Sequence, residues 1–117
     1  MDFKRKITEN VQLVEHMKDG DGTAILCHIL KQDEMFGKGR VFAHLKLEKG
    51  CGVGCHRHDK DCETYYILKG RGKYLLNGEY VSVEPGDVLF VDDGNEHEIY
   101  NEEDEPLEMI ALVLYTT

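Results

Sequence analysis

Apolar and polar residues alternate along much of the chain with the period of two that is typical of β-strands. The clearest case is segment 40–48, in which every second residue is apolar: Val41, Ala43, Leu45 and Leu47. Mostly apolar runs at 24–31, 63–69, 88–91 and 107–115 predict further strands, and a shorter one is expected at 97–101. Segment 8–16 fits either a short strand or an irregular lead-in. Little of the chain has the period of an amphipathic helix.

Turn signals separate these runs at short intervals. Asn77-Gly78 lies between two strand-like runs, and this pair is typical of a type I′ hairpin turn. The Gly70-Arg71-Gly72 segment predicts a bulge or a close backbone approach, after which residues 73–76 continue the strand at 63–69. Eight to ten strands at such spacing predict an all-β, antiparallel sandwich or barrel.

Length and composition bound the class of protein. The 117 residues amount to one domain, residues 1–117, with an N-terminal lead-in of about 20 residues. The formal net charge of −9 argues against nucleic acid and anionic membrane surfaces as partners, since both need basic patches. No apolar run approaches the roughly 20 residues of a transmembrane helix, and no secretory signal is visible, so a cytoplasmic location is expected.

Candidate metal-ligating residues gather in segment 50–70. His56 and His58 are one residue apart, so on an extended strand their imidazoles point to the same side. A short polar turn follows, and Glu63 opens the next strand and can reach the same face. Two neutral imidazoles and one carboxylate are a mixed ligand set for a divalent metal. Downstream, His97 follows a turn and opens a strand, which makes it the candidate for a further ligand.

Two spaced motifs resemble those of the cupin superfamily. The first motif, Gly-x5-His-x-His-x(3–4)-Glu-x6-Gly, is matched at every spacing by Gly50, His56, His58, Glu63 and Gly70. The second motif, Gly-x5-Pro-x-Gly-x2-His-x3-Asn, is matched in spacing by Gly86, Asp92, Gly94, His97 and Asn101. Asp92 stands where the family usually has proline, and an aspartate can shape a turn through its own side chain.

The resemblance implies an antiparallel jelly-roll β-barrel, the double-stranded β-helix of cupins. It also implies that His56, His58, Glu63 and His97 bind one divalent transition metal, for which Mn, Fe, Ni, Co and Zn are all suitable. Such a set leaves two open positions for a ligand. A carboxylate without a thiolate leans away from a closed structural zinc site.

The run at 65–70 and the turn at 92–97 most resemble small cupins described as oxalate-decarboxylase-related. We therefore expect a metal-binding cupin, acting as a metal-dependent lyase, isomerase or dioxygenase on a small carboxylate or polyol that chelates the metal. Two alternatives stay open. One is a non-catalytic module that binds a small ligand or a metal, and the other is a structural cupin with only a vestigial metal.

Other side chains are candidates for the pocket. Tyr65 shares a strand face with Glu63 and is a candidate catalytic residue, the alternative being a packed wall residue. His44 contacts the pocket if its face of the strand points inward, which parity alone does not decide. Phe90 and Ile99 are expected to line the pocket. In contrast, Arg71 and Lys73 attract an anionic ligand only if they face the barrel mouth, and are otherwise solvated.

The four cysteines, Cys27, Cys51, Cys55 and Cys62, are expected to be reduced thiols. Cys55 and Cys62 are sequence neighbours of His56 and Glu63, so on strands they point away from the metal face. A soft-metal site or a redox pair is therefore a weaker interpretation than small residues on loops and outer faces.

Apolar residues are also expected on the outside of the sheet. Tyr66 and Leu68 are outward positions of the strand at 63–69, and outward apolar strands tend to be covered by a partner. The sequence therefore predicts a homodimer, and the family resemblance points the same way.

Overall fold

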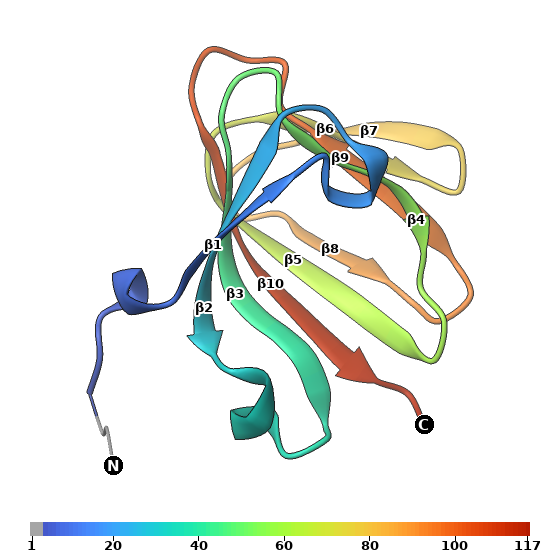
Figure 1. The fold of residues 1–117 in the computed structure, drawn as a ribbon. Helices are drawn as coiled ribbons and strands as arrows, with labels where there is room; N and C mark the ends of the chain where they lie inside the picture. The colour runs from blue at the N-terminus through green and yellow to red at the C-terminus, as the bar shows by residue number, and fades with distance from the viewer. Residues whose placement is uncertain (1–3) are drawn as a thin grey trace.

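Ten β-strands form two antiparallel sheets that face one another in the computed structural model, which describes residues 4–117 (Figure 1). The six-stranded sheet has the order β1 (Val11–Glu15), β2 (Thr23–Leu30), β3 (Gly39–Leu47), β10 (Leu107–Tyr115), β5 (Asp61–Lys69) and β8 (Val88–Val91). The four-stranded sheet has the order β4 (Gly52–Arg57), β9 (Glu96–Tyr100), β6 (Gly72–Leu76) and β7 (Glu79–Val83). The prediction of an all-β antiparallel fold is confirmed.

The remaining regular structure consists of three short 3₁₀ turns, Ile7–Glu9, Met17–Asp19 and Gln32–Met35. No strand pairing joins the two sheets within the described residues. Within residues 4–117 there is also no helix with the length and apolar character needed to cross a membrane. Because no strand pairing joins them in the described residues, the two sheets are held face to face by the packing of the side chains between them.

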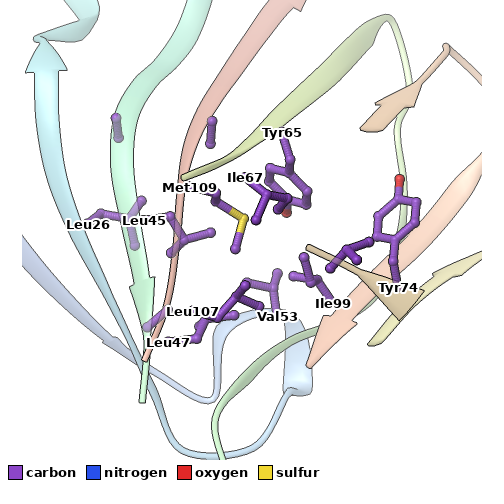
Figure 2. Close-up of a cluster of buried hydrophobic side chains, with 14 residues drawn as sticks. Leu26, Leu45, Leu47, Val53, Tyr65, Ile67, Tyr74, Ile99, Leu107 and Met109 are labelled. Carbon is purple, nitrogen blue, oxygen red and sulfur yellow. The ribbon is translucent and has the colours of Figure 1, made fainter. Parts of the chain in front are cut away.

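The core lies between the two sheets, as the alternation predicted. On β3 the side chains of Ala43, Leu45 and Leu47 are buried, whereas their neighbours are partly exposed. Core side chains from both sheets meet in the gap (Figure 2): Leu26, Leu45, Leu47, Ile67, Leu107 and Met109 from one sheet, and Val53, Tyr74 and Ile99 from the other. Burial of this apolar surface is the main favourable term that holds the sheets face to face.

The two-residue hairpin is confirmed. Asn77 and Gly78 both have positive φ, 48° and 87°, which is the backbone of a type I′ turn. Leu76 lies opposite Glu79, so β6 and β7 pair directly on either side of the turn.

The prediction that residues 73–76 continue the strand at 63–69 is wrong. Gly70 has φ 83° and lies against the carbonyl of Pro106, where a Cβ atom would not fit. The chain turns there and leaves the six-stranded sheet, because only glycine accepts this conformation and contact readily. Gly72 then begins β6 in the other sheet.

Asn101, the last residue of the second motif, holds a turn of the barrel together. Its fully buried amide nitrogen donates to the carbonyl oxygens of Leu47, at 2.9 Å, and Glu105, at 2.8 Å. Its side-chain oxygen accepts from the backbone N–H of Glu103 at 2.9 Å. The end of β3 is thereby tied to the turn that precedes β10.

The change Asn101→Ala is expected to lower the free energy of unfolding by about 2–4 kcal/mol, because three hydrogen bonds are lost and buried backbone groups are left unpaired. Urea unfolding of the metal-free protein measures this. Asn10→Ala is the matched control, since the Asn10 side chain is only partly buried, and we expect a change of about 0.5 kcal/mol or less. Equal urea midpoints for the two variants would contradict the structural role of Asn101.

Candidate metal centre

Four residues from three strands and one turn meet between the sheets. His56 lies on β4, His97 on β9 and Glu63 on β5, while His58 directly follows the last residue of β4. One nitrogen or oxygen atom from each of the four lies within 4.8 Å of the others. All except His56 are buried. The structure thus brings together the four residues that the sequence selected as metal ligands.

Strand pairing explains this convergence. His56 lies directly opposite His97 in the β4–β9 pair, so their side chains share one face. The expected strand ends at Arg57, one residue before His58, yet His58 keeps its inward position. Its backbone N–H donates to the carbonyl of Asn95 at 3.0 Å, which holds the turn beside β9.

The ligand-type atoms lie very close together. The Nε2 atom of His97 is 3.0 Å from Nε2 of His58 and 3.1 Å from Nε2 of His56. The Oε1 atom of Glu63 is 3.1 Å from Nε2 of His97, 3.2 Å from that of His58 and 3.9 Å from that of His56. Three imidazole nitrogens and one carboxylate oxygen therefore surround one point.

Hydrogen bonds on the far side of two rings set their tautomers. The Nδ1 atom of His56 lies 2.7 Å from the carbonyl oxygen of Gly54, and Nδ1 of His58 lies 2.7 Å from Oδ1 of Asp61. Since a carbonyl and a carboxylate only accept, both Nδ1 atoms carry the proton and donate. In the neutral rings each Nε2 then presents a lone pair to the centre, where these lone pairs and the Glu63 carboxylate repel one another unless a proton or a metal cation lies among them. This donor set fits a divalent transition metal.

Two tyrosines hold the third imidazole. The Oη atom of Tyr74 lies 2.8 Å from Nδ1 of His97, so a proton on Nδ1 can be donated to the tyrosine oxygen. The ring of Tyr65 stacks on His97, with centroids 5.3 Å apart and planes at 16°. Tyr65 and Tyr74 come from opposite sheets and project into the same gap (Figure 2).

The charges of the cluster are coupled. Burial raises the pKa of Glu63, but hydrogen bonds from His56, His58 and His97 outweigh it and hold that pKa well below its usual range. At His58, burial lowers the pKa, but hydrogen bonds to Glu63 and Asp61 outweigh it, so the net pKa is raised. At His97, burial prevails and lowers the pKa. Glu63 is therefore an anion at neutral pH, as a metal ligand must be.

Sequence reasoning missed two supporting residues, Asp61 and Tyr74. Asp61 is buried, and its Oδ2 accepts from Nε of Arg40 at 2.9 Å while its Oδ1 holds His58. Burial raises the pKa of Asp61, but the hydrogen bonds from Arg40 and His58 outweigh it, so the carboxyl stays ionised. The available signal was that Asp61 lies two residues before Glu63, on the same strand face. No local signal shows that β6, with Tyr74, pairs with β9.

A small cavity of about 30 Å³ adjoins the cluster. Its lining is mostly apolar and comprises Met17, Lys18, Leu26, Arg40, Val41, Leu45, Val53, Tyr65, Ala111 and Val113, besides His56, His58 and Glu63. The position of Tyr65 on the Glu63 face is confirmed. Burial, with the nearby Glu63 charge, raises the pKa of Tyr65 well above its ordinary value, so the phenol keeps its proton. Its catalytic role stays a prediction.

The predicted pocket contact of Phe90 is wrong, and the orientation of His44, which parity left open, is now decided. Phe90 pairs with Thr64 and is 53% exposed, because the inward positions of β8 are Leu89 and Val91. His44 also points outward, since Ala43 and Leu45 hold the inward positions of β3.

Neither His44 nor Ile99 lines the cavity beside the metal cluster. On the outer face, Nε2 of His44 pairs with Oε1 of Glu108 at 3.0 Å. Ile99 packs in the core and is not part of the described cavity lining, so that prediction is wrong as well.

The charged and sulfur-containing candidates are also placed. Arg71 pairs with Glu84 at 2.8 Å and Lys73 with Glu102 at 3.4 Å, and all of these side chains are exposed, which confirms the solvated alternative. The four cysteines are free thiols, and none of them belongs to the metal-ligand cluster of the described residues. Burial raises the pKa of Cys55 and of Cys62, so neither is an activated thiolate.

Comparisons with known proteins point to one family. The family model described as "Cupin domain" matches residues 43–114. An oxalate-binding protein from Thermotoga maritima is 39% identical over 101 residues, covering 86% of this chain and 84% of that protein. An uncharacterized protein from Methanocaldococcus jannaschii is 30% identical over 94 residues, covering 80% and 73%.

The fold comparison agrees. The crystal structure of a predicted oxalate decarboxylase from Thermotoga maritima matches with a TM-score of 0.91 and 35% identity. The match covers 97% of this chain and 99% of that one. These matches confirm the jelly-roll fold that the sequence predicted.

The change Asp61→Asn is expected to weaken Mn²⁺ binding about 10- to 100-fold, because His58 loses the carboxylate that fixes its tautomer and orientation. Isothermal titration of chelator-treated protein measures the affinity. The matched control is Asp59→Asn, which changes an exposed neighbour of His58 and should leave the affinity unchanged. Equal Mn²⁺ affinity for both variants would show that Asp61 does not support the site.

Proposed function

The chain belongs to the cupin domain family, and on that premise we propose that it is a metal-binding cupin that takes a small carboxylate at one divalent transition metal. The proposed ligands are His56, His58, Glu63 and His97. The observation that carries the proposal is the convergence of three imidazole nitrogens and one ionised carboxylate oxygen on one point between the sheets. The relative named as an oxalate-binding protein supports a dicarboxylate as the ligand.

Each neighbouring group has a distinct part in this proposal. Asp61 and the Gly54 carbonyl hold Nδ1–H of two imidazoles and so aim their lone pairs at the metal. A bound metal supplies Lewis acidity, which polarises a carboxylate that chelates it. The apolar cavity walls exclude water, and this strengthens the electrostatic interactions inside. The small volume of the cavity favours a ligand of few atoms.

Whether the site also performs chemistry depends on a proton donor. Glu63 is the only carboxyl group in the described cavity lining, and it belongs to the proposed ligand set. The Tyr65 phenol is the remaining candidate donor, and its raised pKa makes it a weak acid. This observation favours the second candidate function, which is binding without turnover. The other candidate is a metal-dependent lyase, isomerase or dioxygenase.

Chelator-treated protein is expected to bind one Mn²⁺ per chain and then to bind oxalate only in the Mn²⁺-loaded form. Isothermal titration measures both steps. Glu63→Gln should weaken Mn²⁺ binding at least about tenfold, because an anionic ligand becomes a neutral amide, whereas Glu15→Gln on the surface should not. A wild-type protein that binds none of the five candidate metals would contradict the proposal and favour a structural cupin.

The same samples separate catalysis from binding. Loss of oxalate, or metal-dependent oxygen uptake, that Tyr65→Phe removes while oxalate still binds would assign chemistry to this site. Stable binding with no loss of oxalate would assign the non-catalytic alternative.

We also propose that the outer face of the six-stranded sheet forms a homodimer interface. On the paired strands β5 and β8, Tyr66 is 47%, Leu68 38%, Val88 65% and Phe90 53% exposed. Exposed apolar clusters of this kind on a sheet commonly mark an interface.

Light scattering is expected to give twice the chain mass of 13.4 kDa. Phe90→Glu should shift the protein toward the monomer mass, because it places a charge in the proposed interface. Phe36→Glu is the control, since Phe36 is an exposed aromatic residue in a loop. A wild-type mass of 13.4 kDa would contradict the dimer.

A further inference from the structure

Two cationic side chains lie among the residues that line the metal cavity, and one of them, Arg40, is already paired with Asp61. Five of the residues that line this cavity are not buried, and we call these five the cavity rim: Met17, Lys18, Arg40, Val41 and His56. The two ionic side chains of the rim, Lys18 and Arg40, are both cationic. The whole chain has 23 acidic and 14 basic residues, so a rim with two cations and no carboxylate differs from the rest of the surface.

The backbone that carries Lys18 is strained. His16, Lys18 and Asp19 have φ of 51°, 55° and 64°, in the left-handed region that non-glycine residues rarely adopt. Such residues are costly in free energy and persist where the surrounding structure enforces them. Three of the six non-glycine residues with positive φ in the described chain thus lie in one short turn at the rim.

Packing against β4 holds this turn in place. A Cβ atom on Gly54 would collide with the carbonyl oxygen of Lys18 and with the backbone of Gly20, so the turn sits directly on the strand. Within the turn, the N–H of Asp19 donates to His16 at 2.9 Å, and that of Gly20 to Met17 at 3.0 Å. The Gly54 carbonyl also accepts from His56, so one glycine seats the turn and orients a metal ligand.

Both rim cations have unused hydrogen-bonding capacity. Arg40 donates from Nε to Asp61, and neither of its terminal nitrogens bonds to any other described residue. Its side chain is 35% exposed. Lys18 is exposed and forms no ion pair within residues 4–117. A guanidinium fork and an ammonium group are the usual partners of carboxylate oxygens in proteins.

We propose that Lys18 and Arg40 form an anion-binding rim that selects a small dicarboxylate over a monoanionic chelator. The inference rests on the proposed function of the metal centre. A dicarboxylate that binds the metal through one oxygen of each carboxylate retains two further oxygens and their charge, which the rim cations neutralise. A hydroxy acid such as glycolate chelates in a similar way but retains only one such oxygen.

Titration of oxalate and glycolate into Mn²⁺-loaded protein tests the rim. Lys18→Gln should leave Mn²⁺ affinity unchanged, because Lys18 forms no hydrogen bond or ion pair with the proposed ligands in the described residues. It should weaken oxalate binding about tenfold, with a smaller loss for glycolate. Lys18→Arg should restore oxalate binding. Lys69→Gln, on an exposed lysine outside the cavity, is the matched control and should bind oxalate like the wild type.

Arg40→Gln should weaken oxalate binding as well, and also Mn²⁺ binding, because Arg40 supports Asp61. Wild-type oxalate affinity in the Lys18→Gln protein would overturn the rim and leave the metal site standing. Equal losses for oxalate and glycolate would overturn the selection of a dicarboxylate. Failure of the Mn²⁺-loaded wild type to bind oxalate would overturn the proposed ligand and the rim together.

Discussion

The buried carboxylate of Glu63 is the constraint on which the site depends. A buried charge is costly unless charged or hydrogen-bonding partners compensate it. Here the partners are three imidazoles at 3.1–3.9 Å, and they come from the opposite sheet or the turn that follows it. The cluster therefore needs the two sheets at a fixed separation, which the apolar core beside it sets. In turn, the imidazole lone pairs need a cation, and this need links the fold to metal binding.

The surrounding residues make this arrangement specific. Asp61 and Gly54 fix two tautomers, and Tyr74 holds the third imidazole from behind. Hydrogen-bond partners behind a metal ligand orient the ligand and tune its basicity. The turn that carries Lys18 packs directly against Gly54, so the groups proposed to hold the metal and those proposed to bind the ligand share one piece of backbone.

Much of this architecture could be read from local patterns. The alternation at 40–48, the Asn77-Gly78 turn and the spacing of two motifs predicted the strands, the hairpin and four converging side chains. What failed depends on contacts between distant segments. Parity alone did not say which face of a strand points inward, so the orientation of His44 stayed open, and Phe90 was expected in the pocket although it points outward. Tyr74 was missed because nothing local shows that β6 pairs with β9. Residues 73–76 were assigned to the wrong strand, because the chain turns at Gly70, where φ is positive, and enters the other sheet.

A crystal structure of the Mn²⁺-loaded protein, with anomalous diffraction data, tests the central claim most directly. Four protein atoms should bond one ion, at about 2.0–2.3 Å for nitrogen and oxygen ligands. The account predicts a single strong anomalous peak between the sheets, bonded to Nε2 of His56, His58 and His97 and to a carboxylate oxygen of Glu63. No peak at that point, or an ion bound by other residues, would contradict it.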